Sequence, residues 1–326
     1  MDTNWSQEKI HQLVLEQKEF FRTGQTLDVS WRIEQLKALK RAIKSHEAQI
    51  LRALREDLGR HPVEGYLCDV GAVILQINET ISGLRRWARP EIHYSGMLCF
   101  PSVVTKVYKM PYGTTLIISP FNFPFLLSLG VLTASIAGGN TAVIKASSKS
   151  KSSTRVLREI IGDTFSAEYI TVVDGGHDVA DMCLEERFDK IFYTGSPAVG
   201  KHVMERASVN LTPVALELGG ETGNWCIVRK DADLKDAARK IAFFKICNSG
   251  QICININQVA VAEEFADEFL DLLKKEIIRQ GGEHPSQNPE YPCLITDSAY
   301  RKCADEAEKY RDRIIFGGQG DEAARK

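Results

Sequence analysis

The sequence lacks the features that mark secreted, metal-binding and nucleic-acid-binding proteins. Its eight cysteines are scattered through 326 residues and form neither a CxxC pair nor a zinc-type Cys/His cluster. The formal net charge is only −2, so neither nucleic acid nor an anionic membrane is an expected partner. The N-terminus has no apolar signal-peptide stretch. These absences predict a protein of the reducing cytoplasm that binds no metal ion.

An uninterrupted membrane span is also missing, although residues 111–144 carry no charged side chain. A spanning helix needs about 20 apolar residues without a break. Here Pro120 and Pro124 interrupt the segment early, and Gly138 and Gly139 interrupt it late. The segment is therefore expected to form a buried strand, a loop, a buried helix and a second buried strand, with no membrane partner.

What the sequence does contain, after a helical first part, is a regular alternation of apolar strands and helices. The strand-like runs are TTLIIS (114–119), TAVIKA (141–146), YITVVDG (169–175) and DKIFYTG (189–195). Helix-like stretches separate them, as at 126–137 and 153–165. This order predicts an α/β fold with a doubly wound, Rossmann-like parallel sheet, whose ligands bind at the carboxyl ends of strands. The GxGxxG fingerprint is absent, so periodicity alone does not identify a dinucleotide.

Changes in pattern divide the chain into three units. Residues 1–89 and 111–211 are predicted to form the doubly wound α/β unit, and residues 90–110 an extended hairpin arm. Residues 212–326 are predicted to form a second unit with strands at 213–220, 224–229 and 257–264.

Two residues of this last unit are candidates for chemistry. Cys253 ends the polar, glycine-containing turn NSGQIC, where a thiolate could act as a nucleophile. The alternative is a small buried hydrophobe, which is the commoner fate of a free cysteine. Glu217 lies among apolar residues in VALELGG, and burial would raise its pKa toward that of a general base. By alternation with Leu216 and Leu218, Glu217 could equally face solvent.

Five motifs occur together and in a fixed order: SPFNFP (119–124), AGGNTAVIKASS (137–148), FYTGSPAVGK (192–201), LELGG (216–220) and NSGQIC (248–253). This set resembles the aldehyde dehydrogenase superfamily, and most closely its class-3-like branch for fatty or aromatic aldehydes. The resemblance implies an aldehyde-dehydrogenase-like α/β fold, in which residues 1–89 and 111–211 form the dinucleotide-binding domain, residues 90–110 an oligomerisation arm and residues 212–326 the catalytic domain. It also implies oxidation of an aldehyde to a carboxylic acid with NAD or NADP as cofactor.

The resemblance assigns roles to individual residues. Cys253 matches the catalytic thiol that forms the thiohemiacetal and then the thioester, Asn122 the oxyanion donor, and Glu217 the base that activates water. It places the cofactor against Ser119, Lys145, Ser148, Gly195, Ser196, Leu218 and Gly219. Gly195 and Ser196 open a helix whose free N–H groups suit a pyrophosphate.

The sequence also departs from the family pattern. Ser148 replaces a glutamate that binds the adenosine ribose hydroxyls, which opens the site to NADP. Glu221 stands where LELGG is usually followed by lysine, a reversal without an explanation. Relatives also continue beyond residue 326, so the catalytic domain is expected to be incomplete at its C-terminus and the chain to be truncated.

Several expectations and alternatives remain at this stage. The arm at 90–110 resembles the family's dimer-forming segment and predicts a homodimer. Phe121, Phe123 and Phe244 are candidates for an apolar substrate tunnel, with plain core packing as the alternative. A catalytically inactive dinucleotide-binding relative is the main functional alternative. A relative that transfers the acyl group to coenzyme A is a weaker one, because such enzymes typically lack the glutamate at Glu217.

Overall fold

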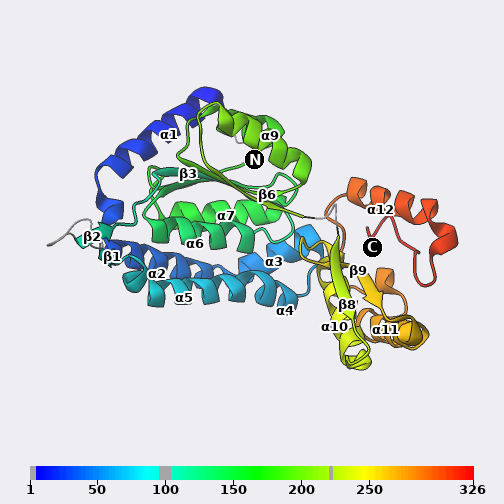
Figure 1. The fold of residues 1–326 in the computed structure, drawn as a ribbon. Helices are drawn as coiled ribbons and strands as arrows, with labels where there is room; N and C mark the ends of the chain where they lie inside the picture. The colour runs from blue at the N-terminus through cyan, green and yellow to red at the C-terminus, as the bar shows by residue number, and fades with distance from the viewer. Residues whose placement is uncertain (1–4, 95–103, 220–222) are drawn as a thin grey trace.

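A five-stranded parallel sheet forms the centre of the protein (Figure 1). The computed structural model describes residues 5–94, 104–219 and 223–326. The strand order is β5-β4-β3-β6-β7. The strands are β3 (Thr114–Ile118), β4 (Thr141–Lys145), β5 (Ile170–Val173), β6 (Lys190–Gly195) and β7 (Val214–Leu218). The predicted doubly wound α/β fold is confirmed, with β3 at the middle of the sheet.

Helices cover the sheet on both faces because its apolar residues alternate in direction. Ile117 packs with α6 (Leu126–Gly138) and α7 (Lys151–Thr164), below which α2, α3 and α5 form another layer (Figure 1). Leu116 and Ile118 point the other way, into a second apolar cluster with helices α1, α8 and α9. The remaining bounds are α1 (Gln7–Arg22), α2 (Val29–Ser45), α3 (Glu47–Leu58), α5 (Gly71–Trp87), α8 (His177–Glu185) and α9 (Pro197–Ser208).

The charge-free segment folds inside the protein. It forms β3, a loop, α6 and β4, as expected from its proline and glycine breaks. Every residue of β3 and β4 is buried. Within the described ranges, no helix combines the length and apolar character needed to cross a membrane.

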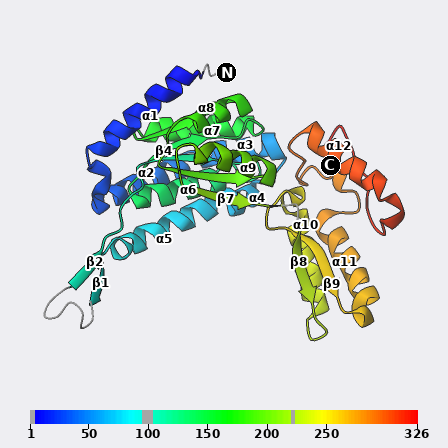
Figure 2. The same cartoon turned by 45° about the horizontal axis from the view of Figure 1, so that its top comes forward.

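A hairpin arm and a second lobe project from opposite ends of the main body (Figure 2). In the arm, β1 (Glu91–Tyr94) pairs antiparallel with β2 (Val104–Val107), and every residue of β2 is exposed. The connection at 95–103 lies outside the described residues.

The second lobe has a small core of its own. Strands β8 (Asn224–Val228) and β9 (Ile256–Val261) are parallel and pack on α10 (Leu234–Ile246) and α11 (Ala266–Gly281), and α12 (Asp297–Lys309) follows. The sequence expectation that residues 213–220 open this lobe needs one correction. β7 pairs in parallel with β6 and therefore belongs to the first sheet. Glu221 lies outside the described residues.

Candidate active site

Cys253 lies at the end of a tightly turned loop between α10 and β9. The loop begins as a 3-10 turn at Cys247–Gly250, in which Asn248 and Ser249 have φ values of 51° and 50°. This left-handed backbone is uncommon for residues other than glycine and needs support from its surroundings. The Cys253 side chain is exposed, so it is not the small buried hydrophobe that the alternative interpretation predicted.

Two strands hold the backbone of Cys253 in place. Asn224 of β8 donates from Nδ2 to the carbonyl oxygen of Cys253 at 2.9 Å and to that of Asn255 at 2.8 Å. Gly219, directly after β7, lies so close that an added Cβ would be 2.8 Å from the Cβ of Cys253. A side chain at position 219 would therefore displace Cys253.

Asn122 joins this loop from the first sheet. It follows β3, is 9% exposed, and donates from Nδ2 to the carbonyl oxygen of Gln251 at 3.0 Å. The amide nitrogen carries two protons, and this bond uses one of them. The predicted oxyanion donor and the predicted nucleophile, 131 positions apart in the numbering of the chain, therefore meet at one loop.

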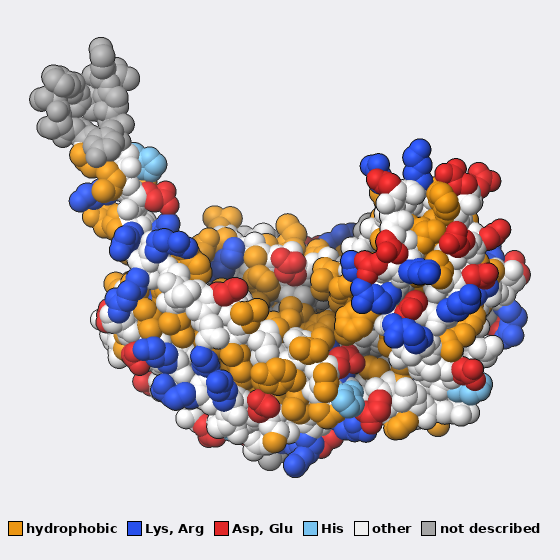
Figure 3. All heavy atoms as spheres, turned by 90° about the horizontal axis from the view of Figure 1, so that it is seen from below, with side chains coloured by type: hydrophobic (Ala, Val, Ile, Leu, Met, Phe, Trp, Pro, Cys, Tyr) orange, Lys and Arg blue, Asp and Glu red, His pale blue; other side chains and the backbone are white. Residues whose placement is uncertain are grey.

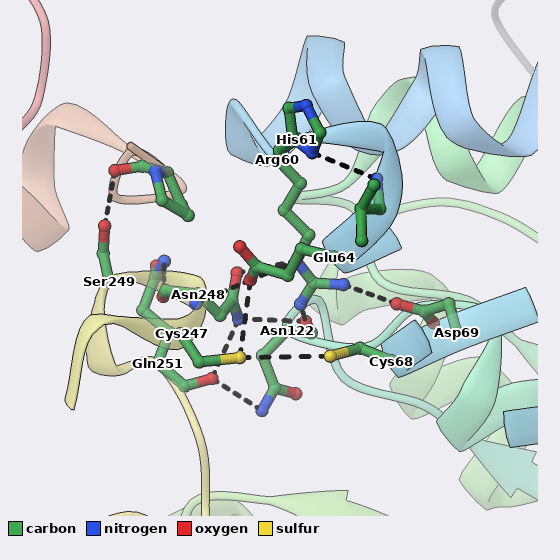
Figure 4. A network of polar contacts seen from close by, with 12 residues as sticks. Arg60, His61, Glu64, Cys68, Asp69, Asn122, Cys247, Asn248, Ser249 and Gln251 are labelled. Carbon is green, nitrogen blue, oxygen red and sulfur yellow. Dashed lines mark hydrogen bonds and ion pairs between the residues drawn. The ribbon is translucent and has the colours of Figure 1, made fainter. Parts of the chain in front are cut away.

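A buried polar network fixes both Asn122 and the loop (Figure 4). The Arg60 side chain is fully buried. Its Nε donates to Oδ1 of Asn248 at 2.9 Å, and its Nη2 donates to the carbonyl oxygen of Asn122. Asn248 in turn donates from Nδ2 to the carbonyl oxygens of Asn122 and Gln251, both at 3.1 Å. One guanidinium, in the connection between α3 and α4 (Pro62–Gly65), therefore holds both segments that carry predicted catalytic residues.

Asp69 completes the network on the other side of Arg60. It accepts from Nη1 of Arg60 through one oxygen. Its other oxygen accepts from the backbone N–H groups of Phe125 at 3.0 Å and Leu126 at 2.8 Å, where α6 begins. Burial raises the pKa of the Asp69 carboxyl, while Arg60 and the two N–H donors oppose that rise. Asp69 thereby anchors the start of α6 next to the loop that carries Asn122.

A cavity of about 490 Å³ opens at the carboxyl ends of β3, β4 and β6, where an α/β sheet is expected to bind its ligand. It brings together most of the predicted cofactor positions: Ser119, Lys145, Ser148, Gly195 and Ser196. Leu218 and Gly219 lie outside this lining, at the end of β7 near Cys253.

Lys145 is built into the floor of this cavity. It is 4% exposed and donates from Nζ to the carbonyl oxygens of Ala146 and Gly175, both at 2.8 Å. Burial lowers the pKa of its ammonium group. Lys145 is thus not the solvated strand-end lysine that is the commoner case. The ammonium has three donors, and the two carbonyl bonds leave one proton for a ligand.

The rest of the lining suits a dinucleotide pyrophosphate. The N-terminal end of α9 reaches the cavity, with Ser196 as its N-cap. Thr194 lines the same space, and its buried Oγ1 has no hydrogen-bond partner among the described residues. A Cβ on Gly195 would lie 2.1 Å from the hydroxyl oxygen of Tyr193, so no side chain fits at that turn. The residues present therefore fit NAD or NADP.

Comparison with known proteins agrees with this geometry. The aldehyde dehydrogenase family model matches residues 3–326. The chain belongs to the aldehyde dehydrogenase family. This confirms the family that the five motifs predicted, including the class-3-like branch, since family 3 members are among the relatives.

Relatives support the assignment across the described chain. The sequence is 39% identical to 4,4'-diaponeurosporen-aldehyde dehydrogenase of Staphylococcus aureus, covering 97% of this chain and 68% of the relative. It is 34% identical to the dimeric NADP-preferring aldehyde dehydrogenase of Canis lupus familiaris, covering 97% and 69%. A substrate-bound structure of Staphylococcus aureus AldH superposes with a TM-score of 0.93 at 38% identity, covering 97% and 69%. The chain spans between 58% and 69% of the length of the curated relatives it matches.

The structure decides between the two alternatives left open for Glu217. Its side chain is exposed, and so is Leu218, which is 43% exposed. Burial of Glu217 among apolar residues is therefore contradicted, and the solvent-facing position is the one observed. The physical reason is that β7 is an edge strand of the sheet: among the described residues it pairs only with β6. Glu217 still lies two residues before Gly219, which touches Cys253.

The three phenylalanines do not line one tunnel within the described residues. Phe121 lines the cofactor cavity. Phe123 is buried, with the Arg60 guanidinium 4.5 Å from its ring centre. Phe244 is 42% exposed on α10, where it contacts Phe243.

Sequence reasoning missed Arg60 and Asp69 altogether. Arg60 lies in the short stretch LGRHP, which has no pattern that separates it from an ordinary surface arginine. The only available signal was indirect: Asp69 interrupts an otherwise apolar stretch at the start of a predicted helix. Partners 62 and 188 positions away become visible only in the fold.

Proposed function

We propose that the chain carries the nucleophile and the cofactor site of an NAD(P)⁺-dependent aldehyde dehydrogenase that forms a carboxylic acid. The observation that carries this proposal is the hydrogen bond from Asn122 to Gln251, two residues before exposed Cys253, in a loop that buried Arg60 supports. The dinucleotide-shaped cavity around Lys145 supports it further. The activity of the named relatives agrees with it.

In the first step, the Cys253 thiolate attacks the aldehyde carbon and forms a carbon–sulfur bond. The developing oxyanion lies between the Asn122 amide and the backbone N–H of Cys253 and is stabilised by both donors. When bound, NAD(P)⁺ accepts the hydride that leaves this carbon. The acyl group then remains on Cys253 as a thioester.

In the second step, Glu217 removes a proton from the water molecule that hydrolyses the thioester. Cys253 is released and the product is a carboxylate. This role is carried over from the family motif LELGG and is supported by the position of Gly219 against Cys253. Transfer of the acyl group to coenzyme A remains the alternative that Glu217 opposes.

We also propose that NADP⁺ is accepted at least as well as NAD⁺. Ser148 lies between the cofactor cavity and a second cavity of about 490 Å³ that is lined by Lys151, Arg155 and Arg158. Both arginines form ion pairs within the protein. Nη2 of Arg155 lies 3.7 Å from Oε2 of Glu56, and Nη1 of Arg158 lies 3.0 Å from Oδ2 of Asp174. Lys151 is exposed at the start of α7, so a 2′-phosphate would meet a positive charge there rather than the family's glutamate.

We further propose a homodimer that resides in the cytoplasm. The hairpin arm extends from the body, and an apolar surface spreads over the hollow face beside it (Figure 3). The segment from α4 (Pro62–Gly65) to the end of α5 carries exposed apolar side chains, among them Val63, Leu67, Leu75 and Trp87. Exposed apolar surface of this kind marks an interaction site. Light scattering after size exclusion tests the dimer, and a monomer at micromolar concentration contradicts it.

The test of the function is aldehyde-dependent absorbance of the reduced nicotinamide, with NAD⁺ and NADP⁺ in parallel. The chain is compared with its Cys253→Ser variant and with a matched Cys303→Ser variant, whose thiol is also exposed but lies on α12. Activity that is lost only in Cys253→Ser supports the dehydrogenase. Cofactor binding without aldehyde oxidation in any of the three would favour the catalytically inactive dinucleotide-binding relative.

A further inference from the structure

Two cysteines that the proposed mechanism does not use face each other beside the catalytic loop. The sulfur of Cys68 lies 3.9 Å from that of Cys247 (Figure 4). Among the described residues, they are the only cysteine pair whose sulfurs are in contact. Both side chains are partly exposed, so small molecules can reach them.

The positions of the two cysteines in the backbone give this contact its importance. Cys68 lies in the π-helical segment Tyr66–Val70 and directly precedes Asp69. Cys247 is the first residue of the 3-10 turn and directly precedes Asn248. π-Helical turns often occur at functional sites. The contact between the two sulfurs therefore links the segments of Asp69 and Asn248, which Arg60 already joins by hydrogen bonds.

We propose that Cys68 and Cys247 are a redox modification site, at which hydrogen peroxide forms a reversible disulfide. A disulfide needs a sulfur–sulfur distance of about 2.05 Å, so the two sulfurs must approach each other by roughly 2 Å. Rotation of the two side chains and a small movement of the turn at Cys247 provide this approach.

The reaction balances in two steps. The Cys68 thiolate attacks one oxygen of hydrogen peroxide, the O–O bond breaks, and sulfenic acid and water form once protons are taken up. The Cys247 thiol then attacks the sulfenic sulfur, the S–O bond breaks, and a second water leaves. Two thiols are oxidised by two electrons, and one peroxide is reduced to two waters. Excess dithiol reverses the bond by thiol–disulfide exchange.

The surroundings assign the order of attack. A hydrogen bond from Cys247 lowers the pKa of the Cys68 thiol, and the Arg60 charge acts in the same direction. The contact with Cys68 raises the pKa of Cys247, as does nearby Glu64, whose carboxylate lies 3.5 Å from the Cys247 sulfur. Because the Glu64 carboxylate is in direct contact with the Cys247 sulfur and disfavours a thiolate there, Cys68 is the thiol that peroxide oxidises first and Cys247 is the one that resolves it.

The bond would fasten the second lobe to the N-terminal helices. It closes a loop between residues 179 positions apart, and long loops gain the most from a cross-link in the chain-entropy description. Oxidation is therefore expected to raise the midpoint of thermal unfolding by roughly 5 °C or more. It also fixes the residue that precedes Asn248, whose side chain holds Asn122.

The test is peptide mapping after stepwise addition of hydrogen peroxide and blocking of the remaining thiols. Trypsin places Cys68 on peptide 61–85, but it leaves Cys247 and Cys253 together on peptide 246–274. Mapping is therefore done on the Cys253→Ser variant, and fragment ions between residues 247 and 253 assign the bond in the unchanged chain. The expected result is a 61–85/246–274 link that dithiothreitol removes.

Matched variants separate this bond from general oxidation. In the Cys253→Ser background, Cys68→Ser should abolish the link and the thermal shift, whereas Cys226→Ser should leave both. If Cys68→Ser fails to fold, fragment ions from the unchanged chain decide the matter. The proposal is overturned if Cys68 and Cys247 are still recovered as blocked thiols at a peroxide dose that has already oxidised Cys253 of the unchanged chain. None of these measurements requires dehydrogenase activity, so the site can fail or stand independently of the proposed function.

Discussion

The cofactor side and the nucleophile side of the site are stabilised in different ways. The cavity around Lys145 lies at the middle of a sheet with a helical layer and an apolar cluster on each face. Cys253 is exposed, and Glu217 lies on an edge strand beside a lobe with a small core. Hydrophobic burial positions the first region, whereas one buried guanidinium and its hydrogen bonds position the second. The comparison teaches that the exposed loop of the predicted nucleophile depends on polar contacts for its geometry.

The largest effect is expected from Glu217→Gln. If Glu217 activates the hydrolytic water, steady-state turnover should fall by about 10²–10⁴-fold, the usual contribution of a general base. The cofactor side should be unaffected, so one equivalent of reduced cofactor per chain should still form in a rapid first turnover. Stopped-flow absorbance measures both phases.

Glu268→Gln is the matched control for a lost surface carboxylate, because the Glu268 side chain is exposed on α11. This variant should leave both phases unchanged. If Glu217→Gln removes the first turnover together with the steady state, the glutamate is not confined to hydrolysis. The division between the two sides of the site would then be wrong.

A comparably large loss, this time of stability, is expected when the Arg60–Asp69 pair is broken on one side. Arg60→Met or Asp69→Leu alone leaves an uncompensated buried charge, which costs about 3–5 kcal/mol. The double variant should cost less than the sum of the single variants, because neither charge remains. Urea unfolding measures these differences in the free energy of unfolding.

The same variants test whether the pair positions the nucleophile. Alkylation of Cys253 by iodoacetamide should slow in the double variant even where the lobe remains folded, since Asn122 and Asn248 lose their shared donor. Arg60→Lys should restore part of the rate, because it keeps the charge but not both hydrogen bonds. Unchanged alkylation across the series would mean that the network is only structural.

A smaller effect is expected at Lys145. Lys145→Met keeps the bulk of the side chain but removes the charged donor, which is worth about 1.5–3 kcal/mol, or roughly 10–100-fold in the dissociation constant of NADP⁺. Fluorescence titration measures this constant. Alkylation of Cys253 without cofactor should not change, since Lys145 contacts only its own side of the site. A slowed alkylation would show that the two regions are coupled.

The same contrast explains how far the sequence could predict the structure. Apolar runs define the sheet, so its elements could be predicted closely. The predicted strand at 114–119 corresponds to β3 (Thr114–Ile118), and the predicted helix at 126–137 corresponds to α6 (Leu126–Gly138). Helix α12 was not predicted, although Ala299, Tyr300, Cys303, Ala304 and Ala307 recur at helical spacing; none of its residues is buried. Short α8, with nine residues, was missed for lack of length.

The site follows the same division. Lys145, Gly195 and Ser196 occur at ends of apolar strands, where the pattern itself indicates a ligand cavity. The residues around Glu217 left both burial and exposure open, because its exposure depends on which strands lie beside β7. Polar networks between distant positions leave no local pattern, and so Arg60 emerged only from the fold.

The smallest effect is expected from Ser148→Glu, which changes only the preference between the two cofactors. A glutamate at this exposed position would repel a 2′-phosphate and accept hydrogen bonds from the ribose hydroxyls of NAD⁺. The ratio of kcat/KM for NADP⁺ to that for NAD⁺ should fall about 10-fold, or roughly 1.4 kcal/mol, since the charges meet near solvent and are screened. Ser82→Glu, at an exposed position on α5 outside both cavities, provides the control for an added charge and should change the ratio less. A tenfold preference for NAD⁺ already present in the unchanged chain would show that Lys151 and its neighbours do not bind the phosphate.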